Sequence, residues 1–202
     1  MANNVRTVPG MGSPPHFVGR DGELDSLLTV LGEAGPVLVY VHGIAGVGKS
    51  ALVSAFADRA RSAGATVVLL DCRAIEPTDR GFIHSLAAAI GSRASTLGAV
   101  SERIGRLGHR VVLILDTYEV FRFLDTWLRE TFLPSLGANV RLVLAGREPP
   151  VTDWLASARW HALVRSVALE PLGDAAALEL LSRNGVGERE ALRINQIGRA
   201  HV

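Results

Sequence analysis

The stretch GIAGVGKS, residues 43–50, decides the fold that the rest of the sequence is expected to adopt. It satisfies the pattern G-x-x-x-x-G-K-[ST], in which a glycine-rich loop surrounds phosphate groups with backbone N–H groups. Lys49 is the only lysine in 202 residues, although lysine and arginine together number 21. A flexible ammonium can reach over the loop to a phosphate, whereas a planar guanidinium is bulkier and hydrogen-bonds as a fork. The single lysine therefore indicates a specific phosphate contact.

The segments on either side of this loop supply the structural context that the motif requires. The run VLVYV at residues 37–41 is continuously apolar, as in a strand buried on both faces. A helix is predicted from Lys49 to Ser62, ending near Gly64. Because a helix N-terminus carries partial positive charge, it favours an anion beside the loop, where the Ser50 hydroxyl can bind Mg²⁺.

The composition is typical of a folded domain with a sizeable core. Hydrophobic residues make up 48% of the chain, and the formal net charge is +1. Acidic and basic residues are interleaved, so charge gives no reason to expect nucleic-acid or membrane partners for this segment. Cys72 is the only cysteine, which excludes an internal disulfide and a cysteine-based metal site. Apolar runs are shorter than the ~20 residues of a spanning helix, and a cytoplasmic location is expected.

Apolar runs of strand length alternate with helical patterns along the chain. This alternation predicts an α/β fold with a three-layer P-loop NTPase core, in which helices cover both faces of a five-stranded, mainly parallel sheet. The expected strands are residues 37–41, 66–70, 110–116, 140–146 and 164–169. The expected helices contain residues 24–31, 49–62, 82–90, 96–107, 121–132 and 175–183, with Asp21 and Asp174 as N-caps. Trp154 and Trp160 are expected in the core.

A phosphate-binding loop needs a carboxylate to hold its metal ion, and Asp116 follows the most apolar of the predicted strands. The carboxyl ends of parallel strands meet at the edge of the sheet where the loop lies. We therefore expect Ser50 and Asp116 to hold Mg²⁺, with water between Asp116 and the ion. The alternative is an ordinary aspartate that ends a strand in a turn.

The sequence indicates the catalytic base and the residue that contacts the γ-phosphate less clearly than it indicates the phosphate-binding loop. Many ATPases carry a glutamate directly after the metal-binding aspartate, where this chain has Thr117. Glu119 is the nearest carboxylate, and it either activates a water molecule or faces solvent. Arg147 ends the fourth predicted strand and either pairs with the γ-phosphate or is a solvated loop arginine. With Lys49 and Asp116, these two residues form the predicted catalytic set, and slow hydrolysis is expected.

Four segments occur in an order that resembles the AAA+-like branch of P-loop ATPases: FVGRDGELDSLL, GIAGVGKS, VVLILDTYE and RLVLAGRE. Over residues 17–185, the chain is most similar to the signal-transduction (STAND) group, which includes origin-recognition-like AAA ATPase domains of bacterial regulators. The resemblance implies ATP or ADP and Mg²⁺ as ligands, and a sensor role for Arg147. It also implies that a helical lid begins at Leu169, Pro171 and Leu172, which match a hydrophobic–Pro–Leu signature.

The resemblance further implies which residues surround the nucleotide. Val18, Gly19 and Arg20 are expected to pack near adenine, with Arg20 touching the nucleotide. The loop and the residue after it are expected around the phosphates: Gly43, Ile44, Ala45, Gly46, Val47, Gly48, Lys49, Ser50 and Ala51. The chain departs from the family at Thr117, where many relatives are acidic, and this leaves both the base and the turnover open.

Four regions are expected along the chain: a flexible leader at residues 1–15, the ATPase core at 16–170, the start of a helical lid at 171–196, and a non-native tail at 197–202. The leader is rich in Gly, Pro and Asn. The tail, IGRAHV, is what one frame of a common short-read sequencing adapter encodes before a stop codon. We therefore hypothesise that the gene was cut after Gln196 and that the protein is truncated there.

Together these features predict the ATP-binding domain of a STAND-type regulatory ATPase, a nucleotide-dependent switch with slow or conditional hydrolysis. The expected partners are ATP, and proteins or further copies of the chain that associate through C-terminal regions absent from this sequence. The alternative is an active AAA+ ATPase, such as an origin-recognition-like initiator or a motor. A P-loop phosphotransferase is a third reading, for which no basic lid over an acceptor pocket is visible in the sequence.

Overall fold

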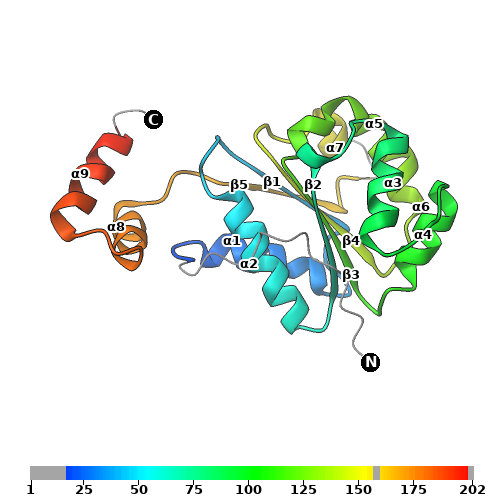
Figure 1. The fold of residues 1–202 in the computed structure, drawn as a ribbon, viewed down its shortest axis with the longest axis horizontal. Coiled ribbons are helices and arrows are strands. Elements are labelled where there is room, and N and C mark those ends of the chain that lie inside the picture. Colours follow the sequence, from blue (N-terminus) through cyan, green and yellow to red (C-terminus); the bar gives the residue numbers. More distant parts are fainter. Residues whose placement is uncertain (1–16, 157–159, 200–202) are drawn as a thin grey trace.

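The computed structural model describes residues 17–156 and 160–199. The predicted leader at residues 1–15 lies outside these ranges, and so do the last three residues of the predicted non-native tail. Within the described ranges, the chain forms a sheet with helices packed on both of its faces, and a separate helical pair at one end (Figure 1).

Five strands of the described chain form one sheet in the order β2-β3-β4-β1-β5, and every neighbouring pair is parallel. This confirms the predicted five-stranded α/β core. The strands lie within two residues of their predicted bounds: β1 (Leu38–His42), β2 (Thr66–Asp71), β3 (Val111–Asp116), β4 (Val140–Gly146) and β5 (Val164–Ala168).

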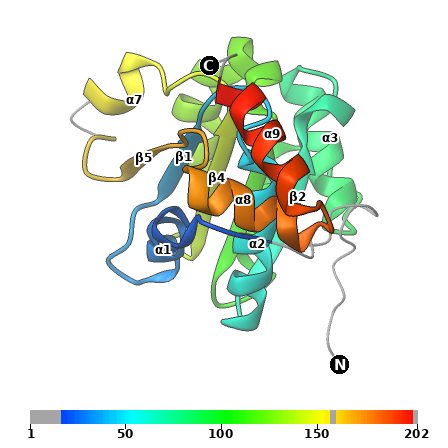
Figure 2. The same ribbon diagram turned by 90° about the vertical axis from the view of Figure 1, so that its left-hand side faces the viewer.

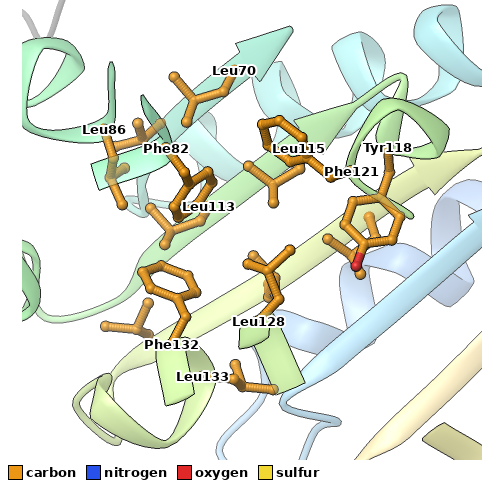
Figure 3. Close-up of a cluster of buried hydrophobic side chains, with 14 of the residues drawn as sticks. Leu70, Phe82, Leu86, Leu113, Leu115, Tyr118, Phe121, Leu128, Phe132 and Leu133 are labelled. Atoms are coloured by element: carbon orange, nitrogen blue, oxygen red, sulfur yellow. The ribbon is translucent and has the colours of Figure 1, made fainter. Parts of the chain in front are cut away.

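The central strands are apolar on both faces because both faces are covered. Every residue of β3 and of β4 is buried. Alternate side chains of these strands point to opposite sides, and each side has its own apolar cluster. Figure 3 shows one of the two clusters, in which aromatic and leucine side chains from the covering helices meet the sheet: Leu70, Phe82, Leu86, Leu113, Leu115, Tyr118, Phe121, Leu128, Phe132 and Leu133.

In the described part of the chain, α1 (Asp21–Leu28) and α2 (Lys49–Ser62) cover one face of the sheet, and a larger number of helices cover the other (Figures 1 and 2). The first face packs against α1 and α2 through residues such as Leu27 and Phe56. The second face packs against α3 (Asp79–Ala89), α4 (Leu97–Gly105), α5 (Asp125–Trp127), α6 (Leu133–Ser135) and α7 (Thr152–Ala156). Among the described residues, 3₁₀ turns join these elements at η1 (Thr29–Leu31), η2 (Cys72–Ala74) and η3 (Tyr118–Leu124).

The predicted helix over residues 121–132 is wrong as a single element. The chain instead runs through η3, α5, a π turn at η4 (Leu128–Phe132) and α6. Pro134 explains the end of this series, because it has no N–H to bond to the carbonyl of Glu130 in an α-helical pattern. The wider π turn occupies the residues immediately before it.

The predicted N-caps are also displaced by one residue. Arg20 and Gly173 occupy the N-cap positions of α1 and of α8 (Asp174–Arg183), and neither makes a side-chain capping bond. Asp21 and Asp174 instead lie in the first helical turn, where a carboxylate is still favourable beside the positive end of the helix dipole.

The helical pair formed by α8 and α9 (Glu188–Arg199) stands apart from the sheet and packs mainly on itself (Figure 1). Its contact with the core is made at the start of α8, where a Cβ added to Gly19 would lie 2.4 Å from that of Ala176. None of the described helices is both long and apolar enough to cross a bilayer.

We expect the substitution Leu113→Ala to lower the free energy of unfolding by ~2–5 kcal/mol, because a fully buried leucine leaves a cavity that the surrounding core cannot fill. Leu192→Ala is the matched control, since this leucine is 45% exposed on α9 and its truncation is expected to change stability by less than ~0.5 kcal/mol. Urea denaturation followed by circular dichroism measures both. Equal effects of the two substitutions would contradict the assigned core.

Candidate functional site

The loop at residues 43–50 connects β1 to α2 through a glycine-rich turn in which Gly46 and Gly48 have positive φ. Gly48 is the N-cap of α2 and has a φ of 102°, which an L side chain rarely adopts. The first N–H groups of α2 have no partner inside the helix, and they lie where its dipole is positive. A Cβ added to Gly43 would lie 2.5 Å from the carbonyl oxygen of Leu169, so only glycine fits beneath this segment.

Lys49 reaches back over the loop that precedes it. Its Nζ donates to the carbonyl oxygens of Gly43 at 2.8 Å and of Ile44 at 2.9 Å. Desolvation lowers the pKa of Lys49, and Arg147 lowers it further, whereas Glu119 and Asp116 oppose these effects. The structure thus brings the four predicted catalytic side chains close enough to influence one another.

Parallel pairing aligns the strand ends that carry these groups. In the register of the sheet, Asp116 lies opposite Ala145, and Gly146 lies opposite His42, the last residue before the loop. The carboxyl ends of β3, β4 and β1 therefore form one edge, as the sequence predicted.

Asp116 is 1% exposed and is only partly satisfied. Its Oδ1 accepts a hydrogen bond from the backbone N–H of Thr117 at 2.9 Å, and its Oδ2 is buried with no hydrogen-bond partner. A buried carboxylate oxygen without a donor is unfavourable unless a cation or water binds it. The donor set of Asp116 and Ser50 thus fits a hard, oxygen-preferring cation such as Mg²⁺.

Glu119 faces the strand ends rather than open solvent. Thr117 has a φ of 57°, in the left-handed region, and η3 begins directly after it. The Glu119 carboxylate lies over the end of β4, where its Oε1 forms an ion pair with Nε of Arg147 at 2.9 Å. Its Oε2 is buried and has no hydrogen-bond partner. Of the two alternatives for Glu119, the geometry favours the one in which this carboxylate takes part in the site.

Arg20 is buried, and both terminal nitrogens of its guanidinium are hydrogen-bonded within the chain. Its guanidinium donates to the carboxylate of Glu23 at 2.7 Å, to the carbonyl of Val47 in the loop at 3.3 Å, and to the carbonyl of Glu170. It therefore braces the loop against the segment that leads to α8. The family resemblance implied that Arg20 touches the nucleotide, and the sequence did not predict its bonds to Val47 and Glu170. These residues are far apart in the chain, and no sequence pattern indicates that they are in contact.

Two features beside the site were not expected from the sequence. Asp71 ends β2 directly opposite Asp116, and its carboxylate accepts hydrogen bonds from the Arg73 guanidinium, which lowers the pKa of Asp71. Behind Glu119, the buried carboxylate of Asp125 accepts hydrogen bonds from Tyr118 and Trp154. The sequence could have indicated that Asp71 lies beside the site, because Asp71 ends a predicted strand just as Asp116 does.

The sequence matches a known protein family, and the fold is similar to that of several solved structures. The family described as AAA ATPase domain matches residues 16–144. Three solved structures are similar: the ORC1 protein of Aeropyrum pernix in complex with DNA (20% identity, TM-score 0.63), Cdc6p of Pyrobaculum aerophilum (16%, 0.62) and the ORC2 protein of Aeropyrum pernix in ADPNP–ADP complexes (15%, 0.65). At these identities, the likeness is one of fold.

The similarity covers most of this chain but only part of each solved structure. It spans 86%, 90% and 91% of this chain, and 50%, 52% and 55% of the respective structures. The chain thus has about half the length of the structures it resembles. A search of the curated proteins found no match.

We expect Arg20→Ala to lower the free energy of unfolding by ~2–3 kcal/mol, because buried hydrogen bonds from a charged donor are lost together. Arg61→Ala is the matched control, since Arg61 forms an exposed ion pair with Asp58 on α2 and its removal is expected to change stability by less than ~0.5 kcal/mol. Urea denaturation measures both. The brace is refuted if the two variants are equally stable.

Proposed function

The chain belongs to the AAA ATPase domain family, and on this premise we propose that it binds ATP with Mg²⁺ at residues 43–50 and hydrolyses it. The observation that carries the proposal is the convergence of four charged side chains on the carboxyl edge of the sheet, beside this glycine-rich loop. Two of these side chains are cations that suit phosphate, and two are acids with a buried oxygen that no donor satisfies.

Lys49 is proposed to bind the β- and γ-phosphates. Its present acceptors are neutral carbonyl oxygens, and phosphate oxygens form stronger, charge-assisted hydrogen bonds with an ammonium. The N–H groups at the start of α2 are proposed to bind the same phosphates. Ser50 and Asp116 would hold Mg²⁺, which when bound supplies positive charge that offsets the charge of the phosphates.

Glu119 is proposed as the general base that accepts a proton from the attacking water. In the structure, its Oε1 is engaged in the ion pair with Arg147 Nε at 2.9 Å. A γ-phosphate that binds Arg147 would compete for this pair and leave Glu119 free to act. Hydrolysis would then depend on correct occupancy of the site, which agrees with the expectation of conditional turnover.

The wider role that we favour is that of an origin-recognition-like AAA+ ATPase, which was the alternative reading of the sequence. Three similar structures are ORC or Cdc6 proteins, and this similarity supports the origin-recognition-like reading. A STAND-type switch remains a second candidate, because Arg147 engages the proposed base and Thr117 stands where many relatives are acidic. In either role, α8 and α9 are proposed as the start of a lid above the nucleotide.

The two readings differ in their partners. The ORC1 protein of Aeropyrum pernix was solved in complex with DNA, so an initiator-like role would include association with DNA. The expectation that this segment itself has no nucleic-acid partner therefore stays a prediction, and so does association with proteins or further copies of the chain. Fluorescence anisotropy with duplex DNA, with and without ATP, separates the possibilities.

We expect Lys49→Ala to weaken ATP binding about 100-fold, or ~3 kcal/mol, because charge-assisted bonds to the phosphates are lost. Lys49→Arg is the informative control, since it keeps the charge, and it is also expected to bind ATP poorly because a planar guanidinium does not fit the loop. Isothermal titration calorimetry measures both. Unchanged ATP affinity in Lys49→Ala would refute the assigned phosphate site.

The sequence permits a second test of the same site without mutation. Lys49 is the only lysine, so an amine-acylating reagent can label only its Nζ and the N-terminal amine of this chain. ATP with Mg²⁺ is expected to protect Lys49 while the N-terminal amine reacts at the same rate. Mass spectrometry after proteolysis reads both positions, and equal labelling of Lys49 with and without ATP would count against the proposal.

We expect Glu119→Gln to lower kcat for ATP hydrolysis by ~10²–10⁴-fold while leaving ATP affinity nearly unchanged, because the amide cannot accept the proton. Glu148→Gln is the matched control: Glu148 lies next to Arg147 but is largely exposed and pairs with Arg122. Phosphate release assays measure turnover. If the parent protein retains ATP without turnover, the STAND-type switch replaces the active ATPase as the favoured reading.

A further inference from the structure

A buried polar cluster lies directly behind Glu119. Asp125 Oδ1 accepts hydrogen bonds from the Tyr118 hydroxyl at 2.7 Å and from Trp154 Nε1 at 2.9 Å. All three side chains are buried. Its three residues come from three separate short elements, η3, α5 and α7. The hydrogen bonds of the cluster therefore hold these elements together.

The chemistry of this cluster makes it rigid. A buried carboxylate is unfavourable unless donors satisfy it, and here two neutral donors converge on one oxygen. A tyrosine hydroxyl is a hydrogen-bond donor at neutral pH, and Tyr118 donates its proton to the Asp125 carboxylate. Loss of either donor would leave the carboxylate partly unsatisfied.

The cluster is linked to the proposed catalytic site through adjacent residues. Tyr118 precedes Glu119 in η3, and the two side chains diverge: Tyr118 points into the apolar cluster (Figure 3), whereas Glu119 pairs with Arg147. The Tyr118 ring also packs edge-on against Tyr40 of β1, with centroids 5.7 Å apart and an interplanar angle of 89°. The segment that carries Glu119 is thus anchored to the strand that leads into the phosphate-binding loop.

This anchor matters because η3 begins in a strained conformation. Thr117 is the only non-glycine residue with positive φ in the described part of the chain, and a β-branched residue in the left-handed region is disfavoured. Such a conformation persists only when surrounding contacts hold it. The hydrogen bond from Tyr118 to Asp125 is made by the residue immediately after Thr117 and is suited to this role.

We propose that Asp125 is a positioning residue, which acts through Tyr118 to hold the Glu119 carboxylate at the carboxyl ends of β3 and β4. Trp154 donates a second hydrogen bond to the same carboxylate oxygen. This inference rests on the proposed role of Glu119 as the base. It adds a buried set of residues, Tyr118, Asp125 and Trp154, which lie outside the loop at residues 43–50 and determine where the base lies.

Tyr118→Phe removes one hydroxyl and keeps the ring. We expect kcat for ATP hydrolysis to fall about 10-fold, since small displacements of a catalytic group have large effects on rate, while the affinity for ATP is unchanged. Tyr40→Phe is the matched control, because its hydroxyl has no hydrogen bond within the described part of the chain and its ring is retained. Equal kcat in Tyr118→Phe and the parent, below the unfolding temperature of both, would overturn the proposal.

The conservative variant separates positioning from a general loss of stability. Asp125→Asn keeps the acceptor oxygen and is expected to retain most of the parental kcat, whereas Asp125→Ala is expected to lose it without a change in ATP affinity. If both variants lose kcat equally, hydrogen bonding by Asp125 is not what holds the base.

A double variant distinguishes failure of this inference from failure of the proposed function. Tyr118→Phe is expected to cause no further loss of kcat in a Glu119→Gln background. A further 10-fold loss there overturns the positioning role, whereas full activity of Glu119→Gln alone refutes the base itself. If turnover is unmeasurable, a crystal structure of Tyr118→Phe decides: displacement of Glu119 from its 2.9 Å contact with Arg147 supports the proposal, and an unchanged contact overturns it.

Discussion

The site depends on the parallel pairing of β3, β4 and β1. Alternate side chains of these strands pack into two different apolar clusters, so a slip by one residue would exchange side chains between the clusters and disrupt the packing of both. Their carboxyl ends are consequently fixed at one edge, with Asp116, Arg147 and the glycine-rich loop at neighbouring positions. Packing far from the loop thereby determines the geometry of the charges beside it.

The charges at this edge compensate one another only in part. Desolvation lowers the pKa of Lys49, and the carboxylates of Glu119 and Asp116 counteract this effect. Each of these acids nevertheless keeps one buried oxygen without a donor. Burial of an unsatisfied carboxylate oxygen costs about 1–3 kcal/mol, or more when it is charged. The arrangement therefore favours entry of a ligand that brings both anionic oxygens and a cation.

Two sets of buried contacts connect the site to the rest of the molecule. Arg20 ties the loop carbonyl of Val47 to that of Glu170, and Leu169 packs over Gly43, so the loop and the segment leading to α8 are joined through backbone groups. On the other face of the sheet, the Asp125 cluster joins η3 to α7. The first set relates the loop to the α8–α9 pair, and the second relates the proposed base to the apolar core.

The sequence by itself determined the strands, the glycine-rich loop, the helix after it and the position of Asp116, because these follow from apolar runs, glycine spacing and the end of a strand. It did not determine the break of residues 121–132 into short turns, the pairing of Glu119 with Arg147, or the partners of Arg20. Local patterns report which face of an element is apolar, whereas these contacts join residues far apart in the chain. Only the strand order and the packing between elements decide which of those residues meet.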